Sequence, residues 1–155
     1  MLIKKEVITK REKYCNSKLS EVIKEIDKID FSGFKNTCIY ITGSYARGEA
    51  GEKSDLDLFF INNSHVKIQR LKKIKIDYFL IRLTEKLNLP AFSKDGEYLQ
   101  IHNIKNILEI GSQEEDYKNY FTARMLFILE SKCLYNKKVY NKVLDEIINA
   151  YWLCA

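Results

Sequence analysis

The sequence predicts an α/β protein in which a few strands lie among helices and the C-terminal part is a helical extension. Two observations carry this prediction. Apolar residues recur at helical spacing over residues 7–29, and again in several segments after residue 103, with charged residues between them. Residues 37–42 and 55–61 are instead rich in β-branched, aromatic and leucine side chains, as short buried strands are. The 155 residues suffice for one compact unit with its own core.

The composition is that of a soluble globular protein. Hydrophobic residues make up 46% of the chain and charged residues 30%, which excludes a disordered class. The apolar runs are too short to span a membrane and the charged start is unlike a signal peptide, so we expect a cytoplasmic protein with no membrane partner. The four cysteines stand alone, without the spacing of a zinc site or a disulfide framework. The net charge of +5 suits an anionic substrate, but charge alone is weak evidence.

The remaining elements are predicted in order along the chain. The first helix should end near residues 30–33, where the apolar pattern breaks. Residues 66–87 fit both an alternating strand and a helix face, and we favour the helix. A turn at residues 93–96 precedes a short strand over residues 97–102. Helices are then expected over residues 104–110, 117–134 and 139–152.

A glycine-serine pair stands at the end of the first predicted strand. Gly43 lets the backbone approach a phosphate closely, and Ser44 offers a hydroxyl and an N–H to phosphate oxygens, above all where a helix begins. Arg47 and Lys53, in the segment that follows, can add positive charge. The pattern is neither a Walker A loop nor a dinucleotide fingerprint. It is nevertheless a candidate site for the phosphates of a nucleoside triphosphate.

Two aspartates begin the second predicted strand. Asp55 and Asp57 alternate with leucines, so in a strand both side chains point to the same face, with Cβ atoms about 6–7 Å apart. Carboxylates held in this way repel each other, and a hard divalent cation, Mg²⁺ or Mn²⁺, offsets the repulsion. Each motif alone is also typical of an ordinary turn or an exposed strand edge. Their combination at this spacing predicts a metal and phosphate site.

The stretch GSYARGEAGEKSDLDLFF, residues 43–60, resembles the motif of the DNA polymerase beta-like nucleotidyltransferase superfamily, in which Gly-Ser after a strand is followed by an acid-x-acid strand. Ala-Arg-Gly after the Gly-Ser pair, and Ser54 before the acids, make it most similar to the nucleotidyltransferase domain of bacterial PII-protein uridylyltransferases and their uncharacterised relatives. The later segment FTARMLFILESKCLYN is similar to the helical region of those relatives. The resemblance covers most of residues 37–152.

The resemblance implies a nucleotidyltransferase fold, with a small mixed β-sheet flanked by helices. It also implies the metal-dependent transfer of a nucleoside monophosphate from a nucleoside triphosphate to an acceptor, with release of pyrophosphate. By their positions in the motif, Gly43 and Ser44 would hold the triphosphate, and we include Arg47, Lys53 and Ser54 among the binding residues.

The resemblance also implies that Asp55 and Asp57 bind the metal ions. Members of this family generally add a third carboxylate, on a later strand, which completes the metal site and helps to deprotonate the acceptor hydroxyl. Asp95 is our first choice, because it follows an intervening helix and precedes the next predicted strand. Asp77 is the rival if residues 75–81 form a strand instead of a helix. The remaining alternative is that no third acid is at work.

On this interpretation the chain is a single compact unit with three parts. Residues 1–33 form an N-terminal helix, residues 34–103 the catalytic core, and residues 104–155 the helical extension. Within the extension, Arg124 and Glu130 either approach the site or form an ion pair within or between helices, and we favour the ion pair.

The substrates are not determined by the sequence. A protein, a small molecule or an RNA end could each serve as acceptor, the nucleotide is open with ATP among the candidates, and so is a homo-oligomeric assembly. Longer relatives continue past the final helix, and a chain that lacks an acceptor-binding part would hold a triphosphate yet turn over slowly. The competing hypothesis is therefore a catalytically weak or inactive nucleotide-binding module, of a regulatory or antitoxin-like kind.

Overall fold

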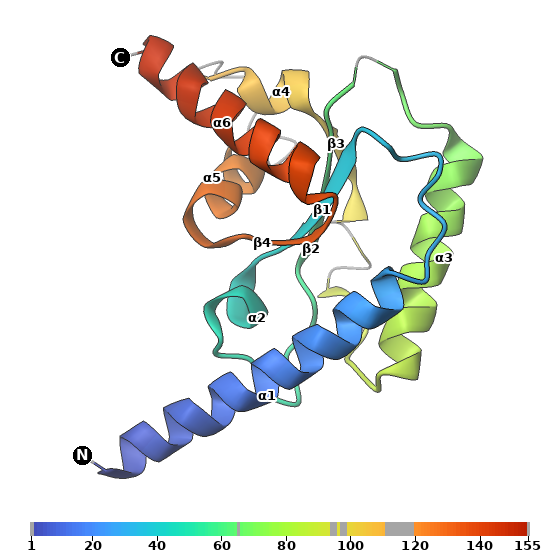
Figure 1. Cartoon of the computed structure of the whole chain (residues 1–155). Helices are drawn as coiled ribbons and strands as arrows, with labels where there is room; N and C mark the ends of the chain where they lie inside the picture. The colour runs from blue at the N-terminus through green and yellow to red at the C-terminus, as the bar shows by residue number, and fades with distance from the viewer. Residues whose placement is uncertain (1, 65, 94–95, 97–98, 111–119, 155) are drawn as a thin grey trace.

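The computed structural model describes residues 2–64, 66–93, 96, 99–110 and 120–154, and these residues form ten helices and strands. None of the described helices is long and apolar enough to cross a membrane. Figure 1 shows the elements, which follow in the order α1 (Leu2–Ile26), β1 (Thr37–Ile41), α2 (Gly43–Arg47), β2 (Leu58–Asn62), α3 (Arg70–Lys86), β3 (Ile101–Asn103), α4 (Ile104–Leu108), α5 (Tyr120–Glu130), β4 (Lys132–Tyr135) and α6 (Lys137–Cys154).

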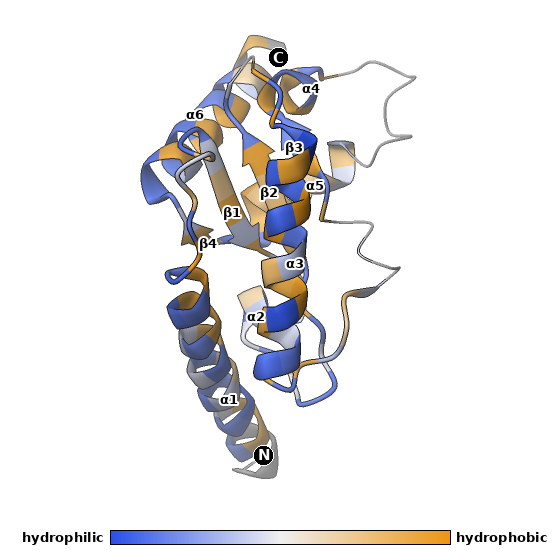
Figure 2. Ribbon diagram, turned by 90° about the vertical axis from the view of Figure 1, so that its right-hand side faces the viewer, coloured by the Kyte–Doolittle hydropathy of each residue, from blue (hydrophilic) through white to orange (hydrophobic). Residues whose placement is uncertain are grey.

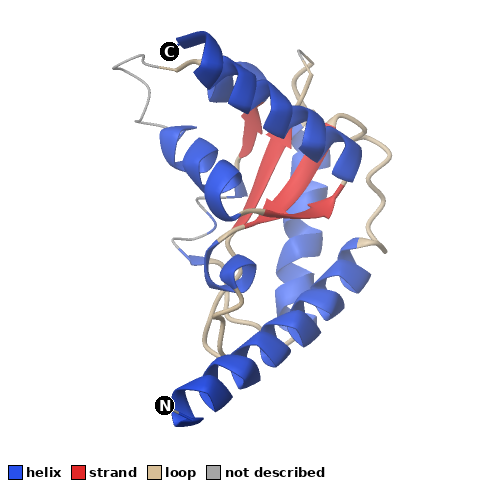
Figure 3. Cartoon of the chain, turned by 60° about the vertical axis from the view of Figure 1, so that its left-hand side comes forward, coloured by secondary structure: helices blue, strands red, loops and turns tan. Residues whose placement is uncertain are grey.

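The four strands form one mixed sheet in the order β3-β2-β1-β4. β1 pairs antiparallel with β2 and with β4, whereas β2 and β3 are parallel. A parallel pair needs a crossover connection, and α3 lies in the connection between these two strands. Figure 3 shows the sheet with helices on both sides. The predicted fold class, a small mixed sheet flanked by helices with a C-terminal helix, is confirmed.

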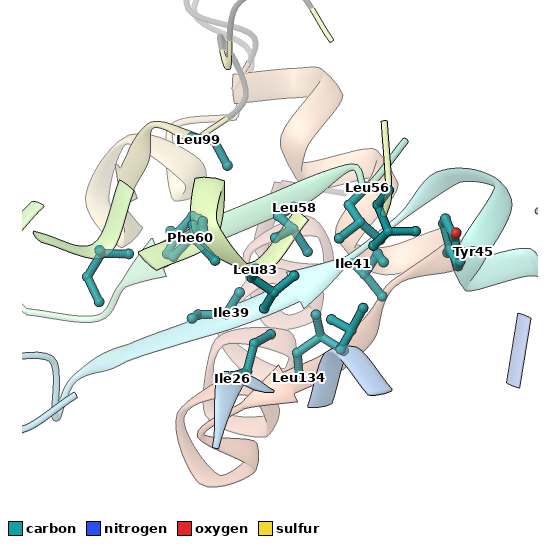
Figure 4. Packing of buried hydrophobic residues seen from close by; sticks show 14 of the residues in the cluster. Ile26, Ile39, Ile41, Tyr45, Leu56, Leu58, Phe60, Leu83, Leu99 and Leu134 are labelled. Atoms are coloured by element: carbon teal, nitrogen blue, oxygen red, sulfur yellow. The ribbon is translucent and has the colours of Figure 1, made fainter. Parts of the chain in front are cut away.

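Both faces of the sheet are covered by hydrophobic packing. On β1, Ile39 and Ile41 belong to one cluster and Cys38 and Tyr40 to the other, because side chains alternate along a strand. The first cluster packs α1 and α3 against the sheet (Figure 4), and the second packs α4, α5 and α6 against the opposite face. A strand covered on both faces has few polar positions, and β1 and β2 are largely orange in Figure 2.

Most predicted elements are confirmed, with shifted ends. The helix favoured over residues 66–87 forms as α3, which spans Arg70–Lys86. The second strand begins at Leu58, so both aspartates precede it instead of lying within it. The strand predicted over residues 97–102 forms only as β3, Ile101–Asn103: residues 99–100 are not in a strand, and residues 97–98 lie outside the described part of the chain.

The helix predicted over residues 117–134 is wrong at its C-terminal end. α5 stops at Glu130, and Lys132–Tyr135 pair with β1 as the edge strand β4. The following residue, Asn136, has a positive φ of 59° and donates to the carbonyl groups of Lys35 and Thr37. Asparagine tolerates this left-handed conformation better than most residues do, so it is the local signal of a break. Pairing with β1 overrides the helical pattern here.

Candidate active site

The corner between β1 and α2 holds the glycine-serine pair. Thr42, the residue between β1 and α2, has an extended backbone, and α2 begins at Gly43, whose φ of 67° lies in the left-handed region. A Cβ atom at this position would collide with Oδ2 of Asp57. Glycine therefore meets two requirements at once, the backbone conformation and the close approach of a carboxylate.

Ser44 holds the segment after α2 close to this corner. Its carbonyl oxygen accepts the N–H groups of Glu49 at 2.8 Å and Ala50 at 3.1 Å. The Ala50 carbonyl in turn accepts a hydrogen bond from the Cys15 thiol of α1 at 3.4 Å. The half-buried Ser44 hydroxyl forms no hydrogen bond within the described part of the chain, so it is available to a ligand.

The acid pair lies beside the corner because β1 and β2 are neighbours. The Thr42 N–H donates to the Asp57 carbonyl at 3.0 Å, which continues the antiparallel pairing one step past the end of the strands. Leu56 is 2% exposed and packs in the core (Figure 4), whereas Asp55 and Asp57 on either side of it are partly exposed. The alternation thus directs the leucine inward and both carboxylates away from that cluster.

The surroundings of Asp57 disfavour the charged form of its carboxyl group. Burial raises the pKa of Asp57 above its ordinary value, the carboxylates of Asp55 and Glu130 raise it further, and Arg47 lowers it only in part. Carboxylate oxygens are the ligands that Mg²⁺ and Mn²⁺ prefer. The described residues contain no group of three or more candidate metal ligands. A metal held by these two aspartates would therefore need further oxygen ligands from outside this described set.

A third carboxylate reaches the corner from the end of α5. Oε1 of Glu130 accepts the Gly43 N–H at 3.0 Å, and Oε2 accepts Nη1 of Arg47 at 2.6 Å. The register explains the approach: Lys132 is paired with Ile41, so two further antiparallel steps bring Glu130 opposite Gly43. Burial would raise the pKa of Glu130, yet the hydrogen bonds from Arg47 and Gly43 outweigh it and lower the pKa. Glu130 is therefore a charged carboxylate at neutral pH.

For Glu130 both alternatives hold, since it forms an ion pair between helices, with Arg47 of α2, and it also approaches the corner. Arg47 also donates from Nε to Glu49 at 2.9 Å, so one guanidinium group serves two carboxylates. Arg124 does not approach the corner. It is 4% exposed and donates to the Tyr151 hydroxyl and the Ile107 carbonyl, which ties α5 to α6 and α4.

The two remaining residues proposed to bind phosphate lie in the turn before the acids. The Ser54 hydroxyl accepts the Gly51 N–H at 3.0 Å, and the Ser54 N–H donates to the Gly51 carbonyl, so this side chain shapes the turn. Lys53 is exposed and forms no ion pair with any residue that the structure describes. A long, unpaired cation next to the acid pair can still move toward an anionic ligand.

The two candidates for a third aspartate have different outcomes. Asp77 lies on α3, where it forms an ion pair with Lys73 one turn earlier at 2.6 Å. The strand on which its candidacy depended does not form, so that alternative is wrong. Asp95 lies outside the described residues, and its role stays a prediction.

Comparison with known proteins agrees with this arrangement. A family model described as a nucleotidyltransferase domain matches residues 16–138, which is most of the chain. The matched segment includes the glycine-serine corner, the acid pair and Glu130. No curated protein and no solved structure gives a significant match. The chain belongs to the nucleotidyltransferase domain family.

Proposed function

We propose that the protein is a metal-dependent nucleotidyltransferase that transfers a nucleoside monophosphate from a nucleoside triphosphate to an acceptor and releases pyrophosphate. The observation that carries this proposal is the position of the Asp57 carboxylate directly against Gly43, at the end of the strand that precedes Ser44. It brings two chemistries together: metal-binding carboxylates and phosphate-binding backbone.

Each residue of the site has a defined task in this proposal. Nucleotidyl transfer needs in-line positioning and neutralisation of charge more than covalent help from the protein. Gly43 and Ser44 would orient the β and γ phosphates, and Arg47 would offset their charge. Asp55 and Asp57 would hold Mg²⁺ or Mn²⁺, which when bound draws electron density from the phosphate oxygens.

The transfer itself exchanges one phosphorus–oxygen bond for another. The acceptor hydroxyl forms a bond to the α-phosphorus, the bond to the pyrophosphate oxygen breaks, and the hydroxyl proton passes to a base. Asp95 is retained as the proposed third carboxylate for that step. The acceptor is a protein, a small molecule or an RNA end, and the similarity to PII-protein uridylyltransferases makes a protein hydroxyl the first to test.

A second candidate function is a nucleotide-binding module with little or no turnover. It is favoured by the state of Arg47, whose guanidinium is already engaged by Glu130 and Glu49. A corner whose cation is neutralised binds a triphosphate less readily than an open one does. We propose a cytoplasmic location for either function.

A labelling experiment distinguishes the transferase from the nucleotide-binding module. The chain is incubated with each α-labelled nucleoside triphosphate, Mg²⁺ or Mn²⁺, and cell lysate, and labelled product and pyrophosphate are measured. Asp55→Asn and Asp57→Asn should each lower product formation at least about a hundredfold, because a catalytic metal contributes several kcal/mol. Asp27→Asn, on an exposed residue after α1, is the matched control and should retain activity.

Other outcomes of this experiment are equally informative. Metal-dependent triphosphate binding without any product from the unmodified chain would favour the binding module. Product formation that survives both aspartate substitutions would refute the assignment of the metal site. An absence of triphosphate binding would refute both functions.

A further inference from the structure

We propose that the Glu130 carboxylate occupies the corner between β1 and α2 where the triphosphate would bind, and that an incoming metal–nucleotide complex must displace it. This inference rests on the proposed function, because it concerns the same corner. It adds a specificity-determining residue, one that makes the corner discriminate between a metal-bound triphosphate and a free one.

The first argument is that Glu130 uses the donors assigned to the phosphates. Its two oxygens accept from the Gly43 N–H at 3.0 Å and from Nη1 of Arg47 at 2.6 Å. A carboxylate and a phosphate both present pairs of oxygens to a guanidinium group, so the same donors suit both anions. A backbone N–H carries a single hydrogen, and one good acceptor uses it. A phosphate oxygen at Gly43 therefore has to replace the Glu130 oxygen.

The second argument is the way the protein places this side chain. Glu130 ends α5, and β4 begins two residues later with Lys132 opposite Ile41. The contact with Gly43 is therefore produced by strand pairing, and does not depend on a flexible surface side chain that happens to reach the corner. The Glu130 side chain is 17% exposed, against 59% for Glu49, the other partner of Arg47.

The third argument is the charge that a ligand meets. Of the described cations, Arg47 is the one that acts on Asp57, and it is shared between Glu130 and Glu49. Asp55 and Asp57 add two more carboxylates beside the corner. A free triphosphate, itself strongly negative, would meet repulsion from these acids. A triphosphate that arrives with a divalent cation offsets the acid pair, and it can then compete with Glu130 for Gly43 and Arg47.

The test measures binding of inorganic tripolyphosphate in the presence of EDTA by isothermal titration calorimetry. Glu130→Gln keeps an acceptor for Gly43 but removes the charge that holds Arg47. We expect its Kd to be about tenfold lower than that of the unmodified chain, equivalent to about 1.4 kcal/mol. Glu49→Gln removes only the exposed partner of Arg47 and leaves the Glu130 contacts in place, so its affinity for tripolyphosphate should rise less than about threefold. Glu85→Gln on α3, far from Arg47 in the ion-pair pattern, should leave the Kd unchanged.

A second readout follows the contact itself. The backbone amide resonance of Gly43 should move in the Glu130→Gln variant, and it should move in the unmodified chain when tripolyphosphate with Mg²⁺ is added. Thermal unfolding of each variant verifies that it is folded. If Glu130→Gln fails to fold, Glu130→Asp, whose carboxylate is one methylene further from Gly43 and Arg47, replaces it in the same comparison.

The outcomes distinguish this inference from the proposed function. If the unmodified chain binds Mg²⁺–ATP but Glu130→Gln binds tripolyphosphate equally well or more weakly, the displacement is refuted and the nucleotide site stands. An equal gain in affinity in Glu49→Gln would show that neutralising either acid beside Arg47 has the same effect and that the position of Glu130 at the corner does not matter, which also refutes displacement. If no variant binds ATP or tripolyphosphate with or without Mg²⁺, both proposals are overturned.

Discussion

Gly43 has a left-handed backbone, and Oδ2 of Asp57 lies where the side chain of any other residue would be. Gly43→Ala should therefore lower the free energy of unfolding by about 2 kcal/mol or more, since the left-handed conformation alone costs a side chain about 1–2 kcal/mol. It should also weaken triphosphate binding, because Asp57 is pushed aside. Chemical denaturation and calorimetric titration measure the two effects.

Gly51 provides the control for that substitution. A Cβ atom there would meet nothing within 4 Å, and its φ is not positive. Gly51→Ala should change stability by less than about 0.5 kcal/mol, as surface substitutions usually do. A similar loss in both variants would show that the Gly43 geometry described above is not what makes that position sensitive.

Asp57 is expected to reduce the stability of the ligand-free protein at neutral pH. Its pKa is raised in the folded state above the ordinary 3.8, so the folded protein holds that proton more tightly than the unfolded chain does. This contribution to stability is present at a pH below the pKa that Asp57 has in the unfolded chain. It is lost as the pH rises through the higher pKa that Asp57 has in the folded protein. At pH 7, Asp57→Asn should therefore raise the Tm measured by thermal unfolding.

The metal dependence of the same variant provides a second comparison. Mg²⁺ should raise the Tm of the unmodified chain but not that of Asp57→Asn, because only a ligand that binds the folded state stabilises it. The difference between the two proteins should also shrink as the pH is lowered. A variant that melts earlier than the unmodified chain at pH 7 would contradict the proposed repulsion.

The residues of the site differ in how far sequence reasoning could place them. Gly43, Ser44, Asp55 and Asp57 are close in sequence, so one strand pairing suffices to bring them together. Glu130 is distant in sequence and reaches the corner only through the register of β4, which the helical pattern of its surroundings concealed. The sequence identifies its partner Arg47 as a candidate cation of the site, but it does not show that Arg47 already forms ion pairs with Glu130 and Glu49.

Among the elements, α1 is predicted to be stable along only part of its length. It has 25 residues, but the side chains of residues 6–13 are exposed, whereas Cys15, Val22 and Ile26 are buried. Figure 3 shows the N-terminal part extending away from the sheet. Short helical segments without packing are marginal in water. Amide hydrogen exchange should therefore be at least about tenfold faster in residues 6–13 than in residues 15–26.

The contrary result would also be informative. Equal protection along α1 would mean that something covers its N-terminal part in solution, and repeating the exchange measurement over a range of protein concentrations would reveal a second copy as the cover. Exchange that is independent of concentration and still uniform would contradict the expectation outright.

A helix or strand could be predicted from the sequence where the spacing of its apolar residues matches the face that is buried in the structure. α3 was ambiguous between strand and helix, and it is settled by one buried stripe, Ile76, Leu80 and Leu83, that packs against the sheet. β4 was missed because a four-residue strand has little periodicity of its own and depends on β1 as its partner. The chain division into residues 1–33, 34–103 and 104–155 stays a prediction, although β4 adds a strand to the part expected to be helical.

At the scale of the whole molecule, the two hydrophobic clusters should unfold together. β1 and β2 contribute alternate residues to each cluster, so neither face of the sheet can lose its packing without exposing strands that the other needs. Leu80→Ala on one side and Ile147→Ala on the other are each expected to cost about 2–5 kcal/mol. Both should lower the same single transition, with calorimetric and van 't Hoff enthalpies equal.

Tyr78 serves as the control for these core substitutions, because it is 58% exposed on α3. Tyr78→Ala should leave the transition within about 0.5 kcal/mol of its original stability. Two resolved transitions, each sensitive to only one of the core variants, would show that the helical layers unfold independently.

The overall architecture was predictable to the level of class. Alternating helices and strands indicated an α/β protein, and the resemblance at residues 43–60 implied the mixed sheet, which is confirmed. Strand order depends on pairing between segments far apart in the chain, and local patterns do not encode it. The nature of the acceptor depends on a surface that no motif in this sequence describes.

The short connection between α5 and β4 affects how the Glu130 carboxylate can leave the corner. Ser131 alone separates the two elements, and its hydroxyl contacts the Phe127 carbonyl and the Tyr140 hydroxyl. The backbone at Glu130 is thus anchored on both sides, and the carboxylate can leave only by rotating about its own side-chain bonds. Clearing the corner would therefore need no movement of α5 or β4, which is the kind of collective motion that takes microseconds or longer.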